Sequence, residues 1–132
     1  MNKKELILQT LENMGYKPEI DDEGDIMVCY QMKTIFVIAG DDEDKYVVVL
    51  LPQFHEIADG EETLVLATCN KLTREVKLVK VFVDQTFKNV SASCEFFYAN
   101  EESLKNCLDK SLQILGVVRS QFRKHKIELS EG

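Results

Sequence analysis

The sequence predicts an α+β fold in which three helices pack on an antiparallel sheet, in the order α-β-β-β-α-β-β-α, similar in layout to a two-layer domain. Three observations lead to this expectation. Apolar residues recur at helical spacing in three stretches, and five short runs between them have the length and composition of strands. The connections between successive strands are short, whereas a parallel pair would need a crossover of a dozen or more residues.

The first part of the chain predicts a helix and then a strand meander. Asn2 with Glu5 three residues later resembles a capping box, and Gly15 stands where a helix ends, so a helix is expected over residues 3–14. Residues 16–20 form a short extended piece, which Pro18 restricts to an edge strand or a lead-in. Three strands are expected next, over residues 26–30, 34–39 and 45–51, the last of them ended by Pro52.

The middle of the chain predicts a helix and then a hairpin. In residues 61–76 the apolar positions are spaced by four, three and four, and they are Val65, Cys69, Leu72 and Val76. The period then becomes two, with Val79, Val81 and Val83 on one side of a strand. In the next strand an apolar face (Val90, Ala92, Cys94, Phe96 and Tyr98) opposes a polar one (Ser91, Ser93 and Glu95), which is typical of a half-buried strand.

A long final helix is expected to follow Asn100, an acceptable N-cap residue. Its large apolar residues step by three and four, so we expect this helix to contribute heavily to the core. Gly116 in mid-helix costs about 1 kcal/mol relative to alanine, which predicts a tight packing contact there. Beyond Lys126 we expect the tail to fray. The basic residues within 119–126 would then lie at the end of the helix. We interpret them as cations that offset the helix dipole, in preference to a binding patch.

Composition limits the class of protein. The chain has 132 residues, of which 45% are hydrophobic and 30% charged, and we expect one domain over residues 1–132. Its net charge is −7, with acidic clusters at residues 21–25, 41–44 and 61–62, which argues against nucleic acid binding. No apolar run is long enough to cross a membrane, and no signal peptide is recognised, so the expected location is the cytoplasm.

No catalytic or metal motif stands out. The four cysteines (Cys29, Cys69, Cys94 and Cys107) lie on apolar faces, and we expect four buried thiols in preference to a metal site or a disulfide. His55 beside Glu56, or Cys69 as a nucleophile, are the candidates if the chain is an enzyme. His55 is expected in a loop without an orienting partner, however, and a buried thiol is unreactive. We therefore expect no catalytic residue, no cofactor and no metal.

The strands of the meander are apolar on both sides, although an antiparallel sheet with one wet face normally shows polar residues there. Either helices cover both faces, or a second chain covers one of them, and we favour the second chain. A second copy is the expected cover, because two-fold dimers are the commonest assembly. A remaining groove could accept a strand or helix of a partner. The expected partner-binding residues are Phe36, Ile38 and Phe82.

Several segments together resemble a known family. They are residues 67–73 (ATCNKLT), residues 80–84 (KVFVD), Phe96 leading into the long helix, and the turn and strand start at residues 22–26. Over residues 4–122 the chain resembles the YbjN family of bacterial proteins, which is similar in fold to the type III secretion chaperones, small, acidic and commonly homodimeric. The resemblance implies a chaperone-like or regulatory role, of the kind held by a sensory transduction regulator, and no catalytic residues. Asn70 within it is expected to bond the backbone where helix meets sheet, with a partner contact as the alternative.

The sequence thus favours a non-enzymatic protein-binding module that is dimeric. The alternatives are a small-molecule sensor or enzyme with an unrecognised site, and a purely structural subunit of a larger assembly.

Overall fold

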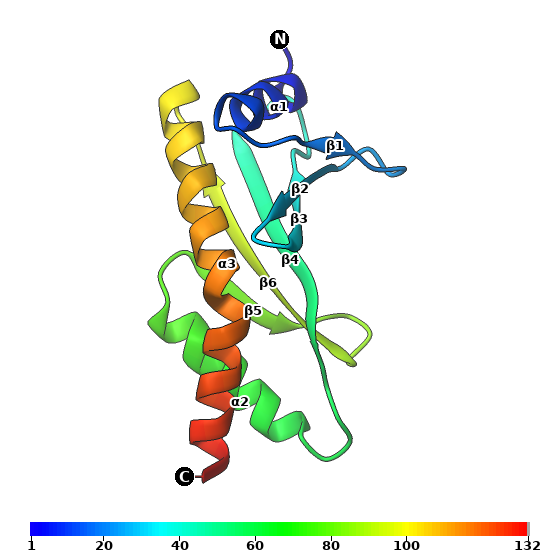
Figure 1. Ribbon diagram of the computed structural model, residues 1–132, viewed down its shortest axis with the longest axis vertical. Helices are drawn as coiled ribbons and strands as arrows, with labels where there is room; N and C mark the ends of the chain where they lie inside the picture. Colours follow the sequence, from blue (N-terminus) through cyan, green and yellow to red (C-terminus); the bar gives the residue numbers. More distant parts are fainter. Residues whose placement is uncertain (132) are drawn as a thin grey trace.

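The computed structural model describes residues 1–131 and contains three helices and six strands (Figure 1). They are α1 (Lys3–Asn13), β1 (Glu19–Ile20), β2 (Ile26–Tyr30), β3 (Lys33–Ile38), β4 (Tyr46–Glu56), α2 (Glu62–Glu75), β5 (Val79–Val83), β6 (Asn89–Phe97) and α3 (Glu101–Glu131). The predicted α+β class and the order of the elements are confirmed, and the short extended piece before residue 21 is the edge strand β1.

The strands form one antiparallel sheet in the order β1-β2-β3-β4-β6-β5. The register pairs Phe36 of β3 with Leu50 of β4, and Val49 of β4 with Cys94 of β6. The strands β1 and β5 are therefore the two edges of the sheet.

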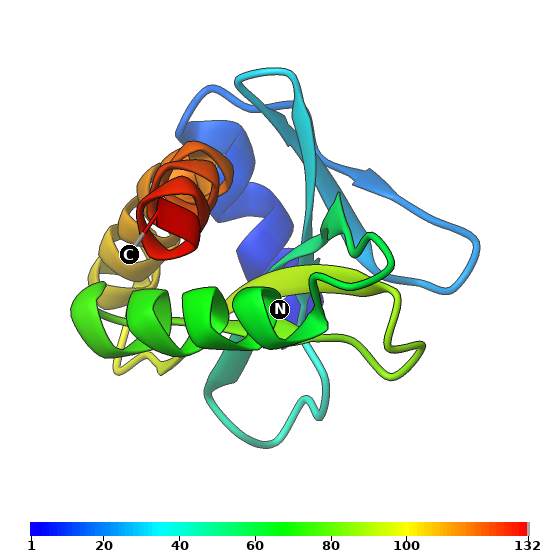
Figure 2. The same cartoon turned by 90° about the horizontal axis from the view of Figure 1, so that it is seen from below.

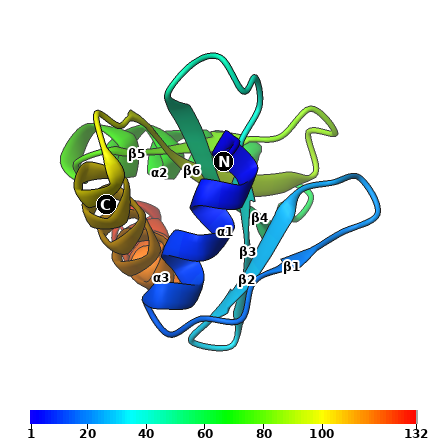
Figure 3. The same cartoon turned by 90° about the horizontal axis from the view of Figure 1, so that it is seen from above.

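All three helices lie on the same side of the sheet, as the views along the long axis show (Figures 2 and 3). Helix α3 has 31 residues, which corresponds to a length of about 46 Å. Its first half lies beside α1 and its second half beside α2 (Figure 1). The sequence left two explanations for the apolar meander: helices on both faces of the sheet, or a second chain on one face. The first explanation is therefore wrong.

The core lies between the sheet and this helical layer. Alternate residues of strands β2 to β6 point into it, including Val28, Val37, Val49 and Ala92. The helices contribute buried side chains that are all 0% exposed: Ile7, Leu11, Val65, Leu72, Leu104, Leu108, Leu112, Leu115, Val118 and Phe122. The expected contribution of the last helix to the core is confirmed.

Gly116 permits a close contact between α3 and the β2–β3 hairpin. A Cβ atom at this position would lie 2.7 Å from Cε1 of Tyr30, closer than real contacts allow. The predicted tight packing at the mid-helix glycine is confirmed. Glycine is tolerated here because the missing side chain gives space to the tyrosine ring, which offsets its low helix propensity.

Strand β4 continues beyond Pro52, so the prediction that this proline ends the strand is wrong. The pairing of β4 with β6 shifts register between Leu51 and His55, and Gln53 has a φ of 47°. In this bulge the backbone N–H of Gln53 donates to Oγ of Ser91 at 2.9 Å. A proline lacks the N–H of a regular ladder, and a bulge is one of the places in a sheet where it fits.

The final helix runs to Glu131, so the expected fraying beyond Lys126 is wrong. The basic residues 119–126 consequently lie inside the helix, and no basic residue stands in its last turn. They do not act as the predicted C-terminal cations. Lys126 instead forms an ion pair with Glu61, with 2.7 Å between Nζ and Oε2.

The acidic turn between β3 and β4 is held by the start of α1. Nζ of Lys3, whose side chain is 2% exposed, lies 2.7 Å from Oδ1 of Asp44 and donates to the carbonyl of Asp41 at 3.0 Å. The hydrogen bond from Lys3 lowers the pKa of Asp44. At the same end of α1, Asn2 accepts from the N–H of Glu5 at 2.8 Å, which confirms the predicted N-cap.

The prediction of four buried thiols is partly wrong. Cys69 and Cys94 are buried, Cys107 is partly buried and Cys29 is exposed, because Cys29 points to the side of β2 that no helix covers. The polar side of β6 also differs from expectation, since Ser91 and Ser93 are 4% and 3% exposed. In the part of the chain that the structure describes, no helix is long and apolar enough to cross a membrane.

Candidate functional site

The face of the sheet opposite the helices is mainly apolar over β2, β3 and β4. Strand alternation brings one set of half-buried side chains to this face of β2, β3 and β4: Met27, Phe36, Ile38, Val48 and Leu50. We call it the helix-free face. An apolar surface of this kind, without cover from its own chain, is typical of an interaction site.

A hollow of about 430 Å³ lies on the helix-free face. Its apolar part consists of Phe36 and Ile38 from β3 together with Leu50 and Pro52 from β4. The turn between β1 and β2 lines the same hollow with four acidic residues, Asp21, Asp22, Glu23 and Asp25. We call it the acidic hollow. Two of the three residues expected to bind a partner, Phe36 and Ile38, thus lie in one depression.

A second hollow, of about 480 Å³, lies between α2 and the edge strand β5. It is lined by Ile57, Glu62, Leu66, Cys69, Val81, Phe82, Val83 and Phe87, most of which are apolar. Leu66 and Phe87 are 58% and 79% exposed. We call it the α2–β5 hollow. It contains Phe82, so the structure separates Phe82 from the other two expected partner-binding residues.

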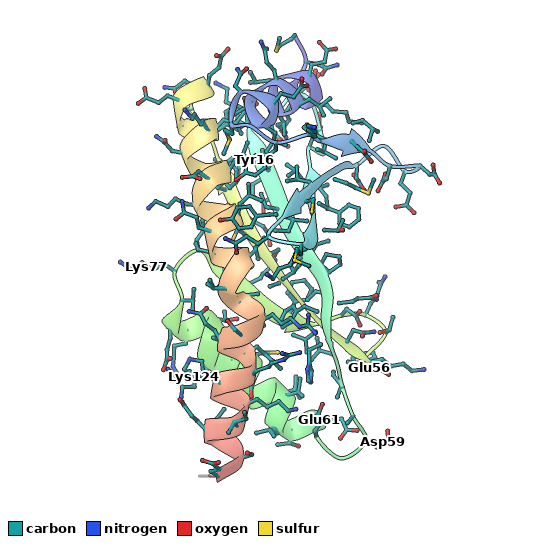
Figure 4. All side chains as sticks on the ribbon, viewed as in Figure 1. Tyr16, Glu56, Asp59, Glu61, Lys77 and Lys124 are labelled. Atoms are coloured by element: carbon teal, nitrogen blue, oxygen red, sulfur yellow. The ribbon has the colours of Figure 1, made fainter. Side chains whose placement is uncertain are left out.

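A polar cluster joins the end of β4, the start of α2 and the C-terminal half of α3. Glu61, labelled in Figure 4, has one carboxylate oxygen 3.0 Å from Nε2 of His55 and the other 2.7 Å from Nζ of Lys126. It also accepts from the N–H of Ala58 at 2.8 Å. Burial acts to raise the pKa of Glu61, but the hydrogen bonds from Lys126, Ala58 and His55 outweigh it and lower this pKa to about 2.

This cluster provides His55 with a hydrogen-bond partner and a structural role. The residue lies in β4 and has Glu61 as a partner, so the expectation of a loop histidine without an orienting partner is wrong. Its ring also packs on Phe122, with 4.9 Å between ring centroids. The hydrogen bonds and the ion pair of Glu61 connect α3 to the segment between β4 and α2.

The thiol of Cys69, the other catalytic candidate, is poorly suited to nucleophilic attack. Burial raises its pKa to about 11, and only the thiolate is a strong nucleophile. Burial likewise raises the pKa of Cys94, to about 12. Among residues 1–131 there is no group of three His, Cys, Asp or Glu side chains that could hold a metal ion.

Thr73, and not Asn70, connects α2 to the sheet. Oγ1 of Thr73 accepts from the N–H of Val81 at 2.9 Å and donates to the carbonyl of Val81 at 3.2 Å. Asn70 is exposed, and the side-chain hydrogen bonds of the described residues include none from it. The predicted backbone bond of Asn70 is therefore wrong, because the helix turns this residue away from the strand.

The fold and these two hollows place the protein among small α+β domains with one open sheet face. The chain resembles the crystal structure of YbjN from E. coli, described as a candidate transcription regulator, with a TM-score of 0.70, 12% sequence identity and 93% of each chain covered. It also resembles a chain of the HopA1–SchA chaperone–effector complex, with a TM-score of 0.60, 12% identity and coverage of 89% of this chain and 92% of that one. An uncharacterised protein from Methanothermobacter thermautotrophicus follows, with a TM-score of 0.52, 15% identity and coverage of 91% and 99%.

The family is shown by the sequence itself. The model of T3SS (YopN, CesT) and YbjN peptide-binding chaperone 1, abbreviated TY-Chap1, matches residues 2–124, and the chain belongs to this family. The resemblance to YbjN and to the type III secretion chaperone fold is thereby confirmed. No curated protein matches the sequence.

Proposed function

We propose that this chain is a non-enzymatic, chaperone-like module that binds a segment of another protein, and that it works as a homodimer. The observation that carries the proposal is the helix-free face, whose apolar side chains have no cover from the chain's own helices. Its membership of a family of peptide-binding chaperones supports the same reading. The catalytic candidates do not favour an enzyme, because His55 serves a structural cluster and Cys69 is a buried thiol.

Selection from a displayed library of random peptides tests the binding function directly. We expect the purified protein to enrich a set of related peptides, and the enriched peptides to compete with one another for the same surface. A matched selection on Phe36→Ser tests whether the helix-free face is used, with circular dichroism confirming that the variant is folded. Failure of the wild-type protein to enrich any peptide would refute the proposal.

The second copy was expected over one face of the meander, but we place the self-association surface at the α2–β5 hollow instead. Strand β5 is an edge of the sheet, although Thr73 bonds the backbone of its central residue Val81, and it lies beside the exposed Leu66 and Phe87. A two-fold pairing would join the same surface from two copies and cover both exposed side chains. The acidic hollow is less suited to this role, because its carboxylates would face those of the second copy.

Replacement of Leu66 by aspartate is therefore expected to convert a dimer into a folded monomer. Leu66 is 58% exposed, so the change should leave the monomer fold intact while placing a charge in the interface. Sedimentation at micromolar concentration measures the mass of both proteins. Val117→Asp is the control, because Val117 is 46% exposed on another helix. A wild-type protein that sediments as a monomer would contradict the homodimer.

A regulatory role and a location in the cytoplasm are further parts of this proposal. They rest on the resemblance to the YbjN family and on the sequence. Identification of the partner that co-purifies from the native cell tests the regulatory role, and fractionation of that cell tests the location. The expectation of a single domain over residues 1–132 also stays a prediction.

A further inference from the structure

We propose that the acidic hollow selects a partner segment in which apolar residues stand next to lysine or arginine. This inference rests on the proposed function, because it concerns the kind of polypeptide that the helix-free face binds. The occupant is a segment of another protein and not a second copy of this chain.

The floor of the acidic hollow can hold apolar side chains of a partner. Phe36 and Leu50 are paired across β3 and β4, and Ile38 lies one pleat further along the same face. All three are half-buried, so they keep apolar surface that a ligand can cover. The hollow's volume of about 430 Å³ is within the range of clefts that accommodate several side chains.

The rim of the hollow carries negative charge in a fixed position. Oδ1 of Asp21 accepts from the N–H groups of Glu23 and Asp25, both at 2.9 Å, which holds the β1–β2 turn in one shape. Asp22 and Glu23 are exposed. Within residues 1–131, none of the ion pairs involves a carboxylate of this turn.

Three acidic groups elsewhere in the protein are paired with lysines. Asp44 is paired with Lys3, Glu61 with Lys126, and Glu95, on the helix-free face, with Lys80 at 2.5 Å. The ammonium of Lys4 lies 3.4 Å from the position that a Cβ on Gly24 would occupy, so one positive charge stands near the four carboxylates of the turn. The turn therefore keeps an excess of negative charge beside an apolar floor.

This charge decides between the possible occupants. In a two-fold dimer formed through the acidic hollow, one acidic surface would face its own copy, on a chain whose net charge is already −7. Like charges in such an interface repel one another, whereas a basic segment is attracted by the negative charge of the turn. A partner with apolar and basic residues side by side complements both the floor and the rim.

Three labelled synthetic peptides test the inference by fluorescence polarisation: alternating leucine and lysine, alternating leucine and glutamate, and alternating serine and lysine. We expect the leucine–lysine peptide to bind most tightly, since it alone matches the floor and the rim. In the double variant Asp22→Asn, Glu23→Gln its affinity should fall about fivefold to tenfold, the loss produced by two surface ion pairs. These two side chains accept none of the hydrogen bonds found in the described residues, so the fold should be unaffected.

The double variant Glu101→Gln, Glu102→Gln is the matched control. It makes the same change in net charge at exposed residues in the first turn of α3, and we expect its affinity to stay within about twofold of the wild type. Equal losses in the two double variants would show a general charge effect and overturn the inference. Equal binding of the leucine–lysine and leucine–glutamate peptides would also overturn it.

The outcomes separate this inference from the proposed function. A random-peptide selection that enriches acidic or uncharged apolar sequences would refute the basic specificity while leaving peptide binding intact. Failure to enrich any peptide would refute peptide binding itself. If the leucine–lysine peptide bound only by dissociating a dimer, and the Asp22→Asn, Glu23→Gln variant strengthened that dimer, the second copy would be the occupant and the inference would be wrong.

Discussion

Replacing Leu108 or Leu115 by alanine is expected to lower the free energy of unfolding by about 2–5 kcal/mol in each variant. Both side chains are 0% exposed and lie in the core cluster between α3 and the sheet. Truncation removes buried apolar surface and leaves a cavity that the surrounding close-packed side chains can fill only in part. Typical domains have a net stability of about 5–15 kcal/mol, so either variant should lose a large share of it.

Denaturant titration followed by circular dichroism measures this loss. Val117→Ala on the same helix is the control, because Val117 is 46% exposed and its truncation should change the stability little. Unchanged denaturation midpoints in both leucine variants would mean that α3 does not dock on the sheet as described.

The substitution Glu61→Gln is expected to lower the stability at neutral pH by about 2–3 kcal/mol. Glutamine keeps the shape of the side chain but loses the charge that Lys126 and His55 face. A hydrogen bond to a charged group contributes about 1.5–3 kcal/mol, and the side chain of Glu61 is only 16% exposed, so solvent replaces it poorly. Glu62→Gln is the control, since it removes the same charge from an exposed neighbour at the same helix end.

The pH dependence of stability gives an independent readout of the same contact. The folded protein lowers the pKa of Glu61 from an ordinary value of 4.5 to about 2. A depressed carboxyl pKa means that the stabilisation is fully present above pH 4.5 and is lost as the pH falls toward 2. The stability difference between the wild type and Glu61→Gln should therefore shrink over this interval. A difference that stays constant from pH 7 to pH 2 would contradict an ionised Glu61 as its source.

The helices and strands were predictable because they depend on local patterns. The spacing of Val65, Cys69 and Leu72 identifies the buried side of α2, and Gly116 marks a close contact before its partner is known. The errors arise where a distant residue decides the local structure. Strand β4 passes Pro52 because Ser91 of β6 accepts the N–H of Gln53 in a bulge, and no pattern around the proline predicts that partner.

The candidate site was predictable only in part, for a related reason. Strand alternation puts Phe36 and Ile38 on one face of the meander, but both faces are apolar, so the sequence alone does not say which face the helices leave open. The sequence also shows an acidic turn at residues 21–25, but its place beside Leu50 depends on the path of the chain in space. Phe82 alternates onto the same face in the register, yet it lines the hollow beside α2, because β4 and β6 stand between its edge strand β5 and β3.

Helix α3 has a consequence for how the molecule opens. Because it runs as one unbroken helix past both α1 and α2, neither half of the helical layer can separate from the sheet without disturbing its attachment to the other half. The free energy of local opening is then high along the whole length of α3. The two shorter helices therefore unfold together with it as one cooperative unit. Amide protons in the buried turns of α1 and α2 should accordingly exchange with solvent through the same global event, while those of the short edge strand β1 exchange by local fluctuation.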